Sequence, residues 1–330
     1  MTLQVSINGR MLRVREGITL IEAAALEGIE IPTLCNHPNL HPVGSCRLCI
    51  VEMEPTGNLT TACTLQVYEG LAVQTETPRL AKKRKEILEL LLEDYADAGY
   101  TAGDQQPTEF EKLLARYGVH RPPSSPALLR YSIDADPNPV IWVDRNKCIL
   151  CTRCVRACAE VQGRFVWGVG ERGHRARIIA GTDTDLLTAR CESCGTCVAH
   201  CPTGALADRM SVGLGKAEHV VTTTCNYCAV GCQLDLNVRN GRIIRVSTRP
   251  TAPVNGLQLC VKGRYGYDFV HHADRLRRPR VRRYLLEKRS LPAAMPQGAA
   301  SANRAARACA RDWSGRPGNP VRAAVGRLTS

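Results

Sequence analysis

The most constraining feature of this chain is its cysteine content, 17 in 330 residues. Sixteen of these cysteines form four sets of four, and Cys309 alone lies outside them. A secreted disulfide protein needs an apolar export signal, but the chain begins MTLQVSINGRMLRVREG, which alternates like a pair of strands. No run of 18 or more apolar residues occurs. We therefore expect a soluble cytoplasmic protein without a transmembrane segment, whose thiols bind metal or do redox chemistry.

The formal net charge of +13 would suit a nucleic-acid partner, but the basic residues are unevenly placed. Residues 288–330 hold 8 Lys and Arg against 1 acid, more than half of the excess. Thiolates in assembled clusters would lower the charge of the remainder further. We therefore expect no nucleic-acid partner. Residues 288–330 are mostly Ala, Arg, Gly, Pro and Ser, which predicts an irregular tail, either disordered or frame-shifted.

Residues 1–79 have the element order of a small β-grasp domain. Asn8-Gly9 lies between two alternating runs and predicts a tight hairpin turn. Thr19 and Glu22 form a capping box for the helix that follows, and a cysteine-bearing loop comes after that helix.

Residues 80–140 are expected to form a helical linker without a cluster. Its first part, LAKKRKEILELLLEDY, has apolar residues at helical spacing, and the KKRK run is interpreted as a solvated helix face. Residues 141–215 contain two cysteine-rich repeats, and residues 216–287 contain a second Asn-Gly hairpin, LDLNVRNGRIIRVS. The expected fold class is α+β, with several small cores supported by metal clusters.

The first set of cysteines has the spacing C-x10-C-x2-C-x13-C. Four thiolates can hold two irons bridged by two sulfides, so this set predicts a [2Fe-2S] cluster. The first interval is longer than in plant-type ferredoxins, and a zinc site is the alternative for such a pattern taken alone. The predicted ligands are Cys35, Cys46, Cys49 and Cys63.

Two frames with the spacing C-x2-C-x2-C-x3-C follow, CILCTRCVRAC and CESCGTCVAHC, 43 residues apart. Three cysteines two apart can converge on one cubane, while the fourth belongs to the other cluster, so the ligand sets cross between the frames. This arrangement predicts a 2x[4Fe-4S] ferredoxin-like domain, and zinc sites rarely use so tight a triple. The second set is Cys148, Cys151, Cys154 and Cys201, and the third set is Cys191, Cys194, Cys197 and Cys158.

Between the frames, GVGERG satisfies the dinucleotide-binding pattern G-x-G-x-x-G by its letters alone. The following HRARIIAGTDTD is typical of a strand and a turn, whereas a phosphate-binding site requires a helix in a βαβ unit. We therefore expect an inserted hairpin here.

The fourth set has the spacing C-x2-C-x3-C-x27-C and begins in CNYCAVGC. One more [4Fe-4S] cluster is the simplest interpretation, and Cys309 is left as a free thiol. The predicted ligands are Cys225, Cys228, Cys232 and Cys260.

These four spacings, in this order, resemble the amino-terminal part of the α subunit of NAD-dependent, molybdenum- or tungsten-containing formate dehydrogenases. That family shares its cluster-bearing segment with the large iron-sulfur subunit of NADH:quinone oxidoreductase and with iron-only hydrogenases. The resemblance covers residues 1–287, and CNYCAVGC resembles the first [4Fe-4S] segment of molybdopterin oxidoreductases. Lys262 stands where the quinone oxidoreductase subunit typically has arginine, which favours the formate dehydrogenases.

The resemblance implies oxidation of formate to CO2 coupled to NAD reduction, with one [2Fe-2S] and three [4Fe-4S] clusters carrying electrons to a flavin- and NAD-binding iron-sulfur subunit. It also implies that Lys262 relays electrons between the fourth cluster and a pterin. The alternative function is a G-like iron-sulfur subunit of NADH:quinone oxidoreductase, or a stand-alone electron-transfer adaptor. Residues 64–147 contain no cysteine, and His120 alone cannot replace the His-and-three-Cys cluster of many relatives, so we expect no fifth cluster.

The resemblance further implies a catalytic domain that binds molybdenum or tungsten through two pterin guanine dinucleotides. That domain does not fit into residues 288–330, so we expect this chain alone neither to bind the pterin cofactor nor to be catalytically competent. No catalytic acid, base or nucleophile is predicted. We also expect exposed apolar surface on the fourth-set segment, where the missing domain would pack.

Overall fold

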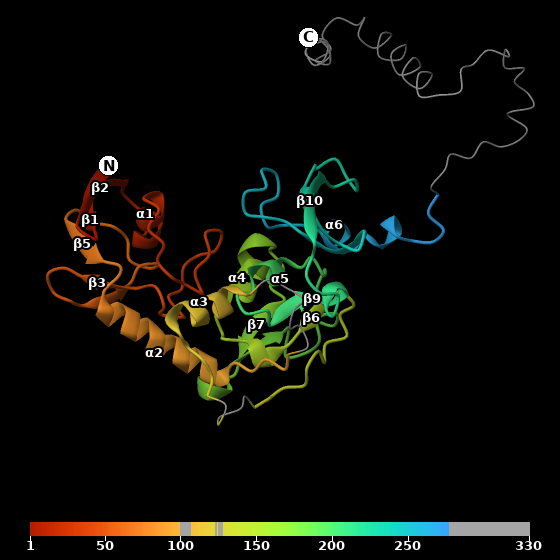
Figure 1. Ribbon diagram of the computed structural model, residues 1–330, viewed down its shortest axis with the longest axis horizontal. Coiled ribbons are helices and arrows are strands. Elements are labelled where there is room, and N and C mark those ends of the chain that lie inside the picture. The colour runs from red at the N-terminus through yellow and green to blue at the C-terminus, as the bar shows by residue number, and fades with distance from the viewer. Residues whose placement is uncertain (100–106, 123, 125–127, 277–330) are drawn as a thin grey trace, which may run out of the picture. The chain divides into compact units, whose positions relative to one another are not determined.

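The computed structural model describes residues 1–276 except 100–106, 123 and 125–127 (Figure 1). The predicted tail, residues 288–330 with Cys309, lies outside these residues, as does the end of the fourth-set segment. No helix in the described ranges has both the length and the apolar character needed to cross a membrane. Four separate cores of buried side chains lie along the chain, and each includes cysteines of the predicted sets.

The first module is a five-stranded mixed sheet in the order β2-β1-β5-β3-β4, with β1 and β5 parallel and the other pairs antiparallel. The predicted hairpin is present, with Asn8 and Gly9 at positive φ, and so is the capping box of α1. Helix α1 packs into the core of the sheet. The elements are β1 (Thr2–Ile7), β2 (Arg10–Arg15), α1 (Leu20–Leu26), β3 (Ile50–Met53), β4 (Leu59–Thr61) and β5 (Leu71–Gln74).

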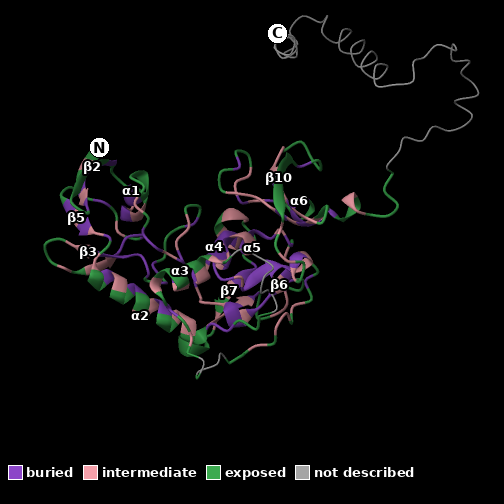
Figure 2. Ribbon diagram, in the orientation of Figure 1, coloured by how far each residue is buried: buried purple, intermediate pink, exposed green. Residues whose placement is uncertain are grey.

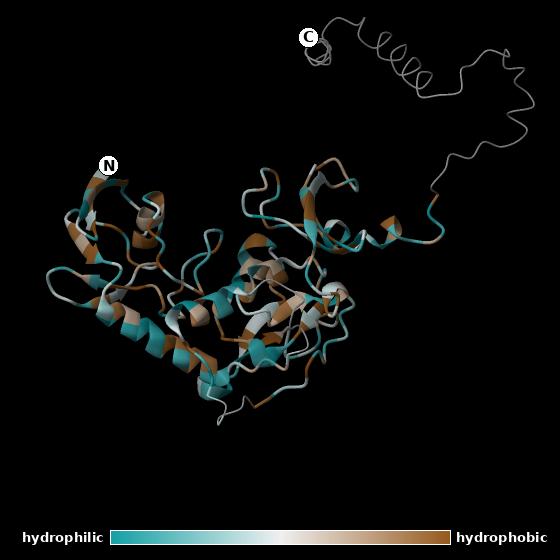
Figure 3. Ribbon diagram, viewed as in Figure 1, coloured by the Kyte–Doolittle hydropathy of each residue, from teal (hydrophilic) through white to brown (hydrophobic). Residues whose placement is uncertain are grey.

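Helices α2 (Pro78–Asp94) and α3 (Glu109–Tyr117) follow the sheet. Figure 3 shows hydrophilic and hydrophobic residues interspersed along α2, as its pattern predicted. The interpretation of the KKRK run was wrong for one residue, because Arg84 is fully buried. Arg84 lies four residues from both Leu80 and Leu88 and so shares their buried face, where apolar packing surrounds it.

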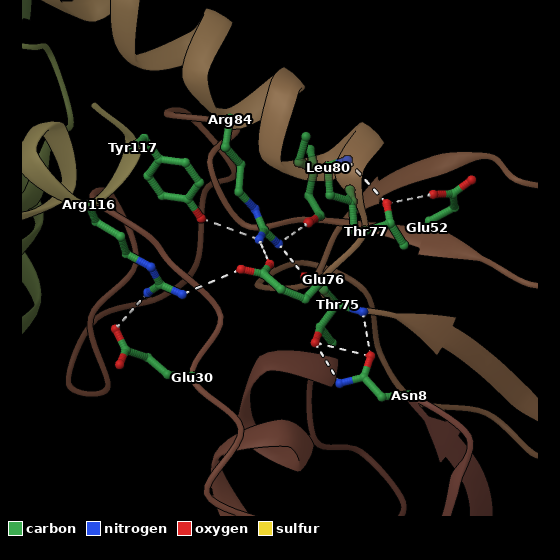
Figure 4. Close-up of polar contacts among 11 residues, drawn as sticks. Asn8, Glu30, Glu52, Thr75, Glu76, Thr77, Leu80, Arg84, Arg116 and Tyr117 are labelled. Atoms are coloured by element: carbon green, nitrogen blue, oxygen red, sulfur yellow. Dashed lines mark hydrogen bonds and ion pairs between the residues drawn. The ribbon is translucent and has the colours of Figure 1, made fainter. Parts of the chain in front are cut away.

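The buried guanidinium of Arg84 connects α2 to the first module (Figure 4). Its Nη2 donates to the carbonyl oxygens of Ile50 at 2.7 Å and Thr75 at 2.8 Å, and Nη1 pairs with the carboxylate of Glu76. Glu76 also faces Arg116 of α3 at 3.5 Å, so one carboxylate is shared by two arginines from successive helices. A lysine in place of Arg84 could not satisfy these divergent acceptors.

The next module along the chain, after helices α2 and α3, contains the two cysteine frames. Strands β6 and β9 pair antiparallel and are largely buried (Figure 2). The GVGERG segment lies in the predicted inserted hairpin, because β7 and β8 pair antiparallel around it. The elements are β6 (Ile141–Val143), η1 (Arg145–Lys147), α4 (Arg153–Arg156), η2 (Ala157–Val161), β7 (Trp167–Gly170), η3 (Gly173–Arg175), β8 (Arg177–Ala180), α5 (Thr196–His200) and β9 (Leu206–Asp208).

The last module is a three-stranded antiparallel sheet in the order β10-β11-β12, with the second predicted hairpin turning at Asn240 and Gly241. Apolar side chains are exposed here, among them Val254 (55%) and Phe269 (40%), and all six residues of β10 are exposed. The elements are η4 (Arg209–Ser211), β10 (His219–Thr224), β11 (Gln233–Arg239), β12 (Arg242–Ser247), α6 (Val261–Tyr265) and η5 (Asp268–Val270).

Candidate iron-sulfur cluster sites

The structure brings the first set together in one buried site. The backbone N–H of Cys35 donates to the Sγ of Cys46 at 3.4 Å. The hydrogen bond with Cys35 and burial raise the pKa of Cys46, while a hydrogen bond with Cys63 lowers the pKa of Cys49. A hydrogen bond with Cys35 lowers the pKa of Cys63, but a hydrogen bond with Cys49 and burial together outweigh it and raise the pKa to about 11. The four cysteines thus lie within hydrogen-bonding or electrostatic reach of one another, which fits ligands of a single [2Fe-2S] core.

The second set lines a single cavity. Cys201 comes from the second frame, yet it shares this cavity with the first three cysteines of the first frame. The remaining lining is mostly apolar and includes Trp167 and Ile178. Burial raises the pKa of Cys148 to about 11 and that of Cys154 well above the ordinary range. Thiols that strongly resist ionisation in an apolar cavity need a metal core to hold them as thiolates, so the residues fit a cluster.

The third set also draws on both frames. Burial raises the pKa of Cys191 and Cys197, and the charge of Cys158, from the first frame, raises both further. Two sulfurs accept backbone hydrogen bonds, Cys158 from Val166 at 3.4 Å and Cys191 from Ser193 at 3.3 Å. The residues therefore fit a second cluster that accepts stabilising N–H donors.

The fourth set is the most accessible one. Cys225 is buried, Cys232 is half-buried, and Cys228 and Cys260 are exposed. The backbone N–H of Cys225 donates to the carbonyl oxygen of Cys232 at 2.7 Å, which closes the CNYCAVGC loop.

Helix α6 begins directly after Cys260, whose Sγ accepts the backbone N–H of Gly263 at 3.4 Å. A Cβ at Gly263 would lie 3.7 Å from the Sγ of Cys225, so this glycine marks close approach of the helix to two cysteines of the set. Lys262 lies on the exposed side of the same helix.

All sixteen cysteines of the four sets are free thiols in the described part of the chain. No three His, Cys, Asp or Glu side chains among the described residues are arranged to bind a single metal ion. A zinc site would place four ligands within about 2.3 Å of one ion, whereas a cluster distributes its ligands over several irons.

Sequence reasoning missed the polar residues that join the sites. The rings of His37 and His200 contact each other in a tilted arrangement, with centroids 4.5 Å apart and 57° between their planes, and these residues lie close in sequence to Cys35 and Cys201. Burial, and then the nearby His200, lowers the pKa of His37 to about 4, so both rings stand neutral against neighbouring arginines. Arg153 reaches the same region, donating to the carbonyl oxygen of Asn36 at 2.7 Å and pairing with Glu109. In the sequence, the arginines between the cysteines of CILCTRCVRAC were the feature that could have indicated these linking residues.

Three family models match successive parts of the chain. They are the 2Fe-2S iron-sulfur cluster binding domain over residues 1–78, the ferredoxin-like domain of NADH-quinone oxidoreductase subunit 3 over residues 138–207, and the molybdopterin oxidoreductase Fe4S4 domain over residues 218–272. Together with the four cysteine sites they define the class: the chain is an iron-sulfur protein with one 2Fe-2S domain, a ferredoxin-like 4Fe-4S domain and a molybdopterin oxidoreductase Fe4S4 domain.

Several of the homologous proteins are subunits of NADH- or NADPH-linked oxidoreductases. The chain is 36% identical over 284 residues to the NADH-quinone oxidoreductase G 2 subunit of Rhizobium meliloti (strain 1021), covering 85% of this chain and 33% of that protein. It is 36% identical over 286 residues to NADPH-Fe(3+) oxidoreductase subunit alpha of Geobacter sulfurreducens (strain DL-1 / KN400), covering 84% and 33%. The chain thus spans about a third of the length of these relatives.

A solved structure of NAD+-reducing [NiFe]-hydrogenase in the H2-reduced state matches with a TM-score of 0.55 and 29% identity, covering 64% of this chain and 89% of that chain. Formate dehydrogenases match only at greater distance. A putative one from Staphylococcus haemolyticus (strain JCSC1435) is 24% identical over 323 residues, covering 84% of this chain and 32% of that protein.

Proposed function

We propose that this chain is the electron-transfer section of an NAD(P)-linked oxidoreductase complex. The observation that carries the proposal is the convergence of the second set, including Cys201 from the other frame, on one apolar cavity. Proteins with the matched domains are subunits of such complexes, which supports the same conclusion. The clusters supply one-electron steps, and the chain's own residues bind them, keep water away and adjust their charge.

The proposed ligands are the sixteen cysteines of the four sets, with one [2Fe-2S] cluster on the first and one [4Fe-4S] cluster on each of the others. Backbone N–H groups donate to sulfur in the first, third and fourth sites. Such hydrogen bonds stabilise negative charge on sulfur and raise the reduction potential. Increasing exposure from the first to the fourth site adds a second influence on the potentials.

The proposal has a second part, which concerns the identity of the oxidoreductase to which this electron-transfer chain belongs. A formate dehydrogenase with a molybdenum or tungsten bis-pterin site, in which Lys262 relays electrons to the pterin, is supported by the molybdopterin oxidoreductase match and by the place of Lys262 after Cys260. A G-like subunit of an NADH:quinone oxidoreductase is supported about equally, because such relatives show the higher identity. In both cases the proposed partner is a flavin- and NAD-binding iron-sulfur subunit in the cytoplasm.

Site-directed loss of single cysteines tests the cluster assignment. We expect anaerobically purified protein to contain iron and acid-labile sulfide in equal amounts, and little zinc. Cys201→Ser is expected to remove the same electron paramagnetic resonance signal as Cys148→Ser, and to leave the signal that Cys191→Ser removes. Zinc in place of iron, or loss of the Cys191 signal in Cys201→Ser, would contradict the proposal.

The two whole-protein alternatives are separated by the complex isolated anaerobically from the source cells through a tag on this chain. Cluster reduction by formate, together with molybdenum or tungsten in the preparation, would support the formate dehydrogenase. Reduction by NADH but not by formate, without either metal, would support the G-like subunit.

A further inference from the structure

The two cysteine frames differ in how an arginine reaches them. With the offset of 43 residues, Cys151 of the first frame corresponds to Cys194 of the second. The carbonyl oxygen of Cys151 accepts a hydrogen bond from Arg156 Nη2 at 3.2 Å, and that of Cys194 accepts one from Arg264 Nε at 3.0 Å. Equivalent carbonyls are thus each bound by a buried arginine, although the two arginines come from different parts of the chain.

Arg156 ties the first site to the second. The same Nη2 that binds Cys151 donates to the carbonyl oxygen of Cys35 at 2.5 Å, so one nitrogen joins ligand residues of two neighbouring sites. Nη1 donates to the carbonyl oxygen of His41 at 2.6 Å, and Nε to the hydroxyl of Thr152 at 3.4 Å. Every nitrogen of this guanidinium is therefore used at the junction, and the side chain is only 8% exposed.

Arg264 ties the third site to the fourth. It lies on α6, and its backbone N–H donates to the carbonyl oxygen of Cys260 at 3.0 Å, while its Nε reaches Cys194. Its Nη2 donates to the carbonyl oxygen of Leu257 at 3.0 Å. The second frame has Ala199 where the first has Arg156, so it holds no arginine of its own at that position, and the fourth-set segment supplies one.

No acidic side chain forms an ion pair with these two arginines in the described part of the chain, although Arg264 lies near the buried Asp208, whose pKa is raised by burial and lowered in part by the charge of Arg264. Two other buried cations of the same module are paired, Lys147 with Asp97 at 2.8 Å and Arg153 with Glu109 at 2.8 Å. Neither Arg156 nor Arg264 forms an ion pair among the described residues, although both are nearly inaccessible to water. A buried charge of this kind is costly unless a negative group lies nearby, and clusters with four thiolates each are such groups.

We propose that Arg156 and Arg264 are positioning residues that each hold two neighbouring cluster sites together and raise the reduction potentials of both clusters. The proposal rests on the proposed function, because it requires loaded clusters. A guanidinium binds several carbonyls in a fixed plane and so fixes the separation of the segments, and its charge favours the reduced, more negative cluster.

The test is redox titration of the full chain, monitored by electron paramagnetic resonance, with variants at each junction. Arg156→Met is expected to lower the potentials of the first and second clusters, with a roughly tenfold change in the reduced-to-oxidised ratio, or 59 mV for one electron. Arg264→Met is expected to shift the third and fourth clusters by a similar factor instead. The matched control is Arg177→Met, because Arg177 is in the same module but pairs with Asp183 at 2.5 Å.

Lysine variants separate charge from position. Arg156→Lys and Arg264→Lys keep the charge, so potentials near those of the wild type are expected, but one ammonium cannot hold all the acceptors. We therefore expect weaker magnetic interaction between the two adjoining clusters in the lysine variants. If the methionine variants do not bind clusters, the proposal is tested by the magnetic interaction between adjoining clusters in the lysine variants.

Shifts no larger than those of Arg177→Met, or equal shifts at all clusters, would overturn the proposal, as would lysine variants with unchanged magnetic interaction. A wild-type preparation without clusters would instead contradict the proposed function, so the two failures are distinguishable.

Discussion

Replacing Gly195 with alanine should detach the last module from the second cysteine frame. Gly195 has φ +72, a left-handed conformation that favours glycine. A Cβ on this residue would lie 2.4 Å from Arg264 Cδ and 2.4 Å from Tyr265 Oη. Arg264 and Tyr265 are 5% and 4% exposed, so neither has free space into which it can move. The substitution must therefore break the hydrogen bond from Arg264 to Cys194 or displace α6.

The expected cost has two parts. The left-handed conformation costs a non-glycine residue about 1 kcal/mol. Forcing an extra methyl into a packed contact adds about 1–3 kcal/mol. The sum of about 2–4 kcal/mol corresponds to a fall in melting temperature of roughly 4–16 °C at about 2–4 °C per kcal/mol.

Gly173→Ala provides the matched control, because Gly173 has φ +61 and a Cβ added there would have no atom within 4 Å. It should carry the conformational cost alone. The assay is anaerobic thermal unfolding followed by far-ultraviolet circular dichroism and by the visible absorbance of the clusters. We expect Gly195→Ala to lower the melting temperature at least twice as much as Gly173→Ala, with loss of the fourth cluster first. Equal shifts in the two variants would refute the packing argument.

Three further outcomes are expected. Arg84→Met should lower the free energy of unfolding by about 3 kcal/mol, because it leaves buried carbonyl oxygens without a donor. Arg79→Met should lower it by less than about 1 kcal/mol, since the Arg79 side chain is 53% exposed. Urea unfolding, followed by the visible circular dichroism of the first cluster, compares the two variants. Burial raises the pKa of Asp208 to about 6, above the roughly 3.9 of an unfolded aspartate, so the folded state holds the proton longer and stability should fall as pH rises through 6. Asp208→Asn should flatten this dependence in melting temperatures measured from about pH 4.5 to 7.0, a range that covers most of the interval between the two pKa values; an unchanged slope would contradict it. Removal of iron by an anaerobic chelator should lower the melting temperature and expose apolar surface to a fluorescent dye, since the clusters contribute folding free energy; unchanged melting would count against this.

The sequence alone determined the local features of the protein. The spacings of the cysteines indicated cluster sites, because ligands two or three residues apart can reach one inorganic core wherever the chain folds around it. The Asn-Gly turns and the Thr19–Glu22 capping box follow from backbone preferences of a few adjacent residues, and both are present in the structure. The segment between the frames could be assigned to a hairpin and not to a dinucleotide site in the same way, because the residues that follow GVGERG locally favour a strand and a turn over a helix.

Only the tertiary structure decided which residues join the sites. Arg84 belongs to a run of cations that its local pattern assigns to the surface, yet the carbonyl acceptors that bury it come from β3 and from the end of β5. Arg156 and Arg264 occupy equivalent places at two junctions, but one lies within its cysteine frame and the other is 70 residues away from Cys194. No periodicity or motif links such residues, because their partners are backbone carbonyl oxygens whose positions exist only after the modules have packed.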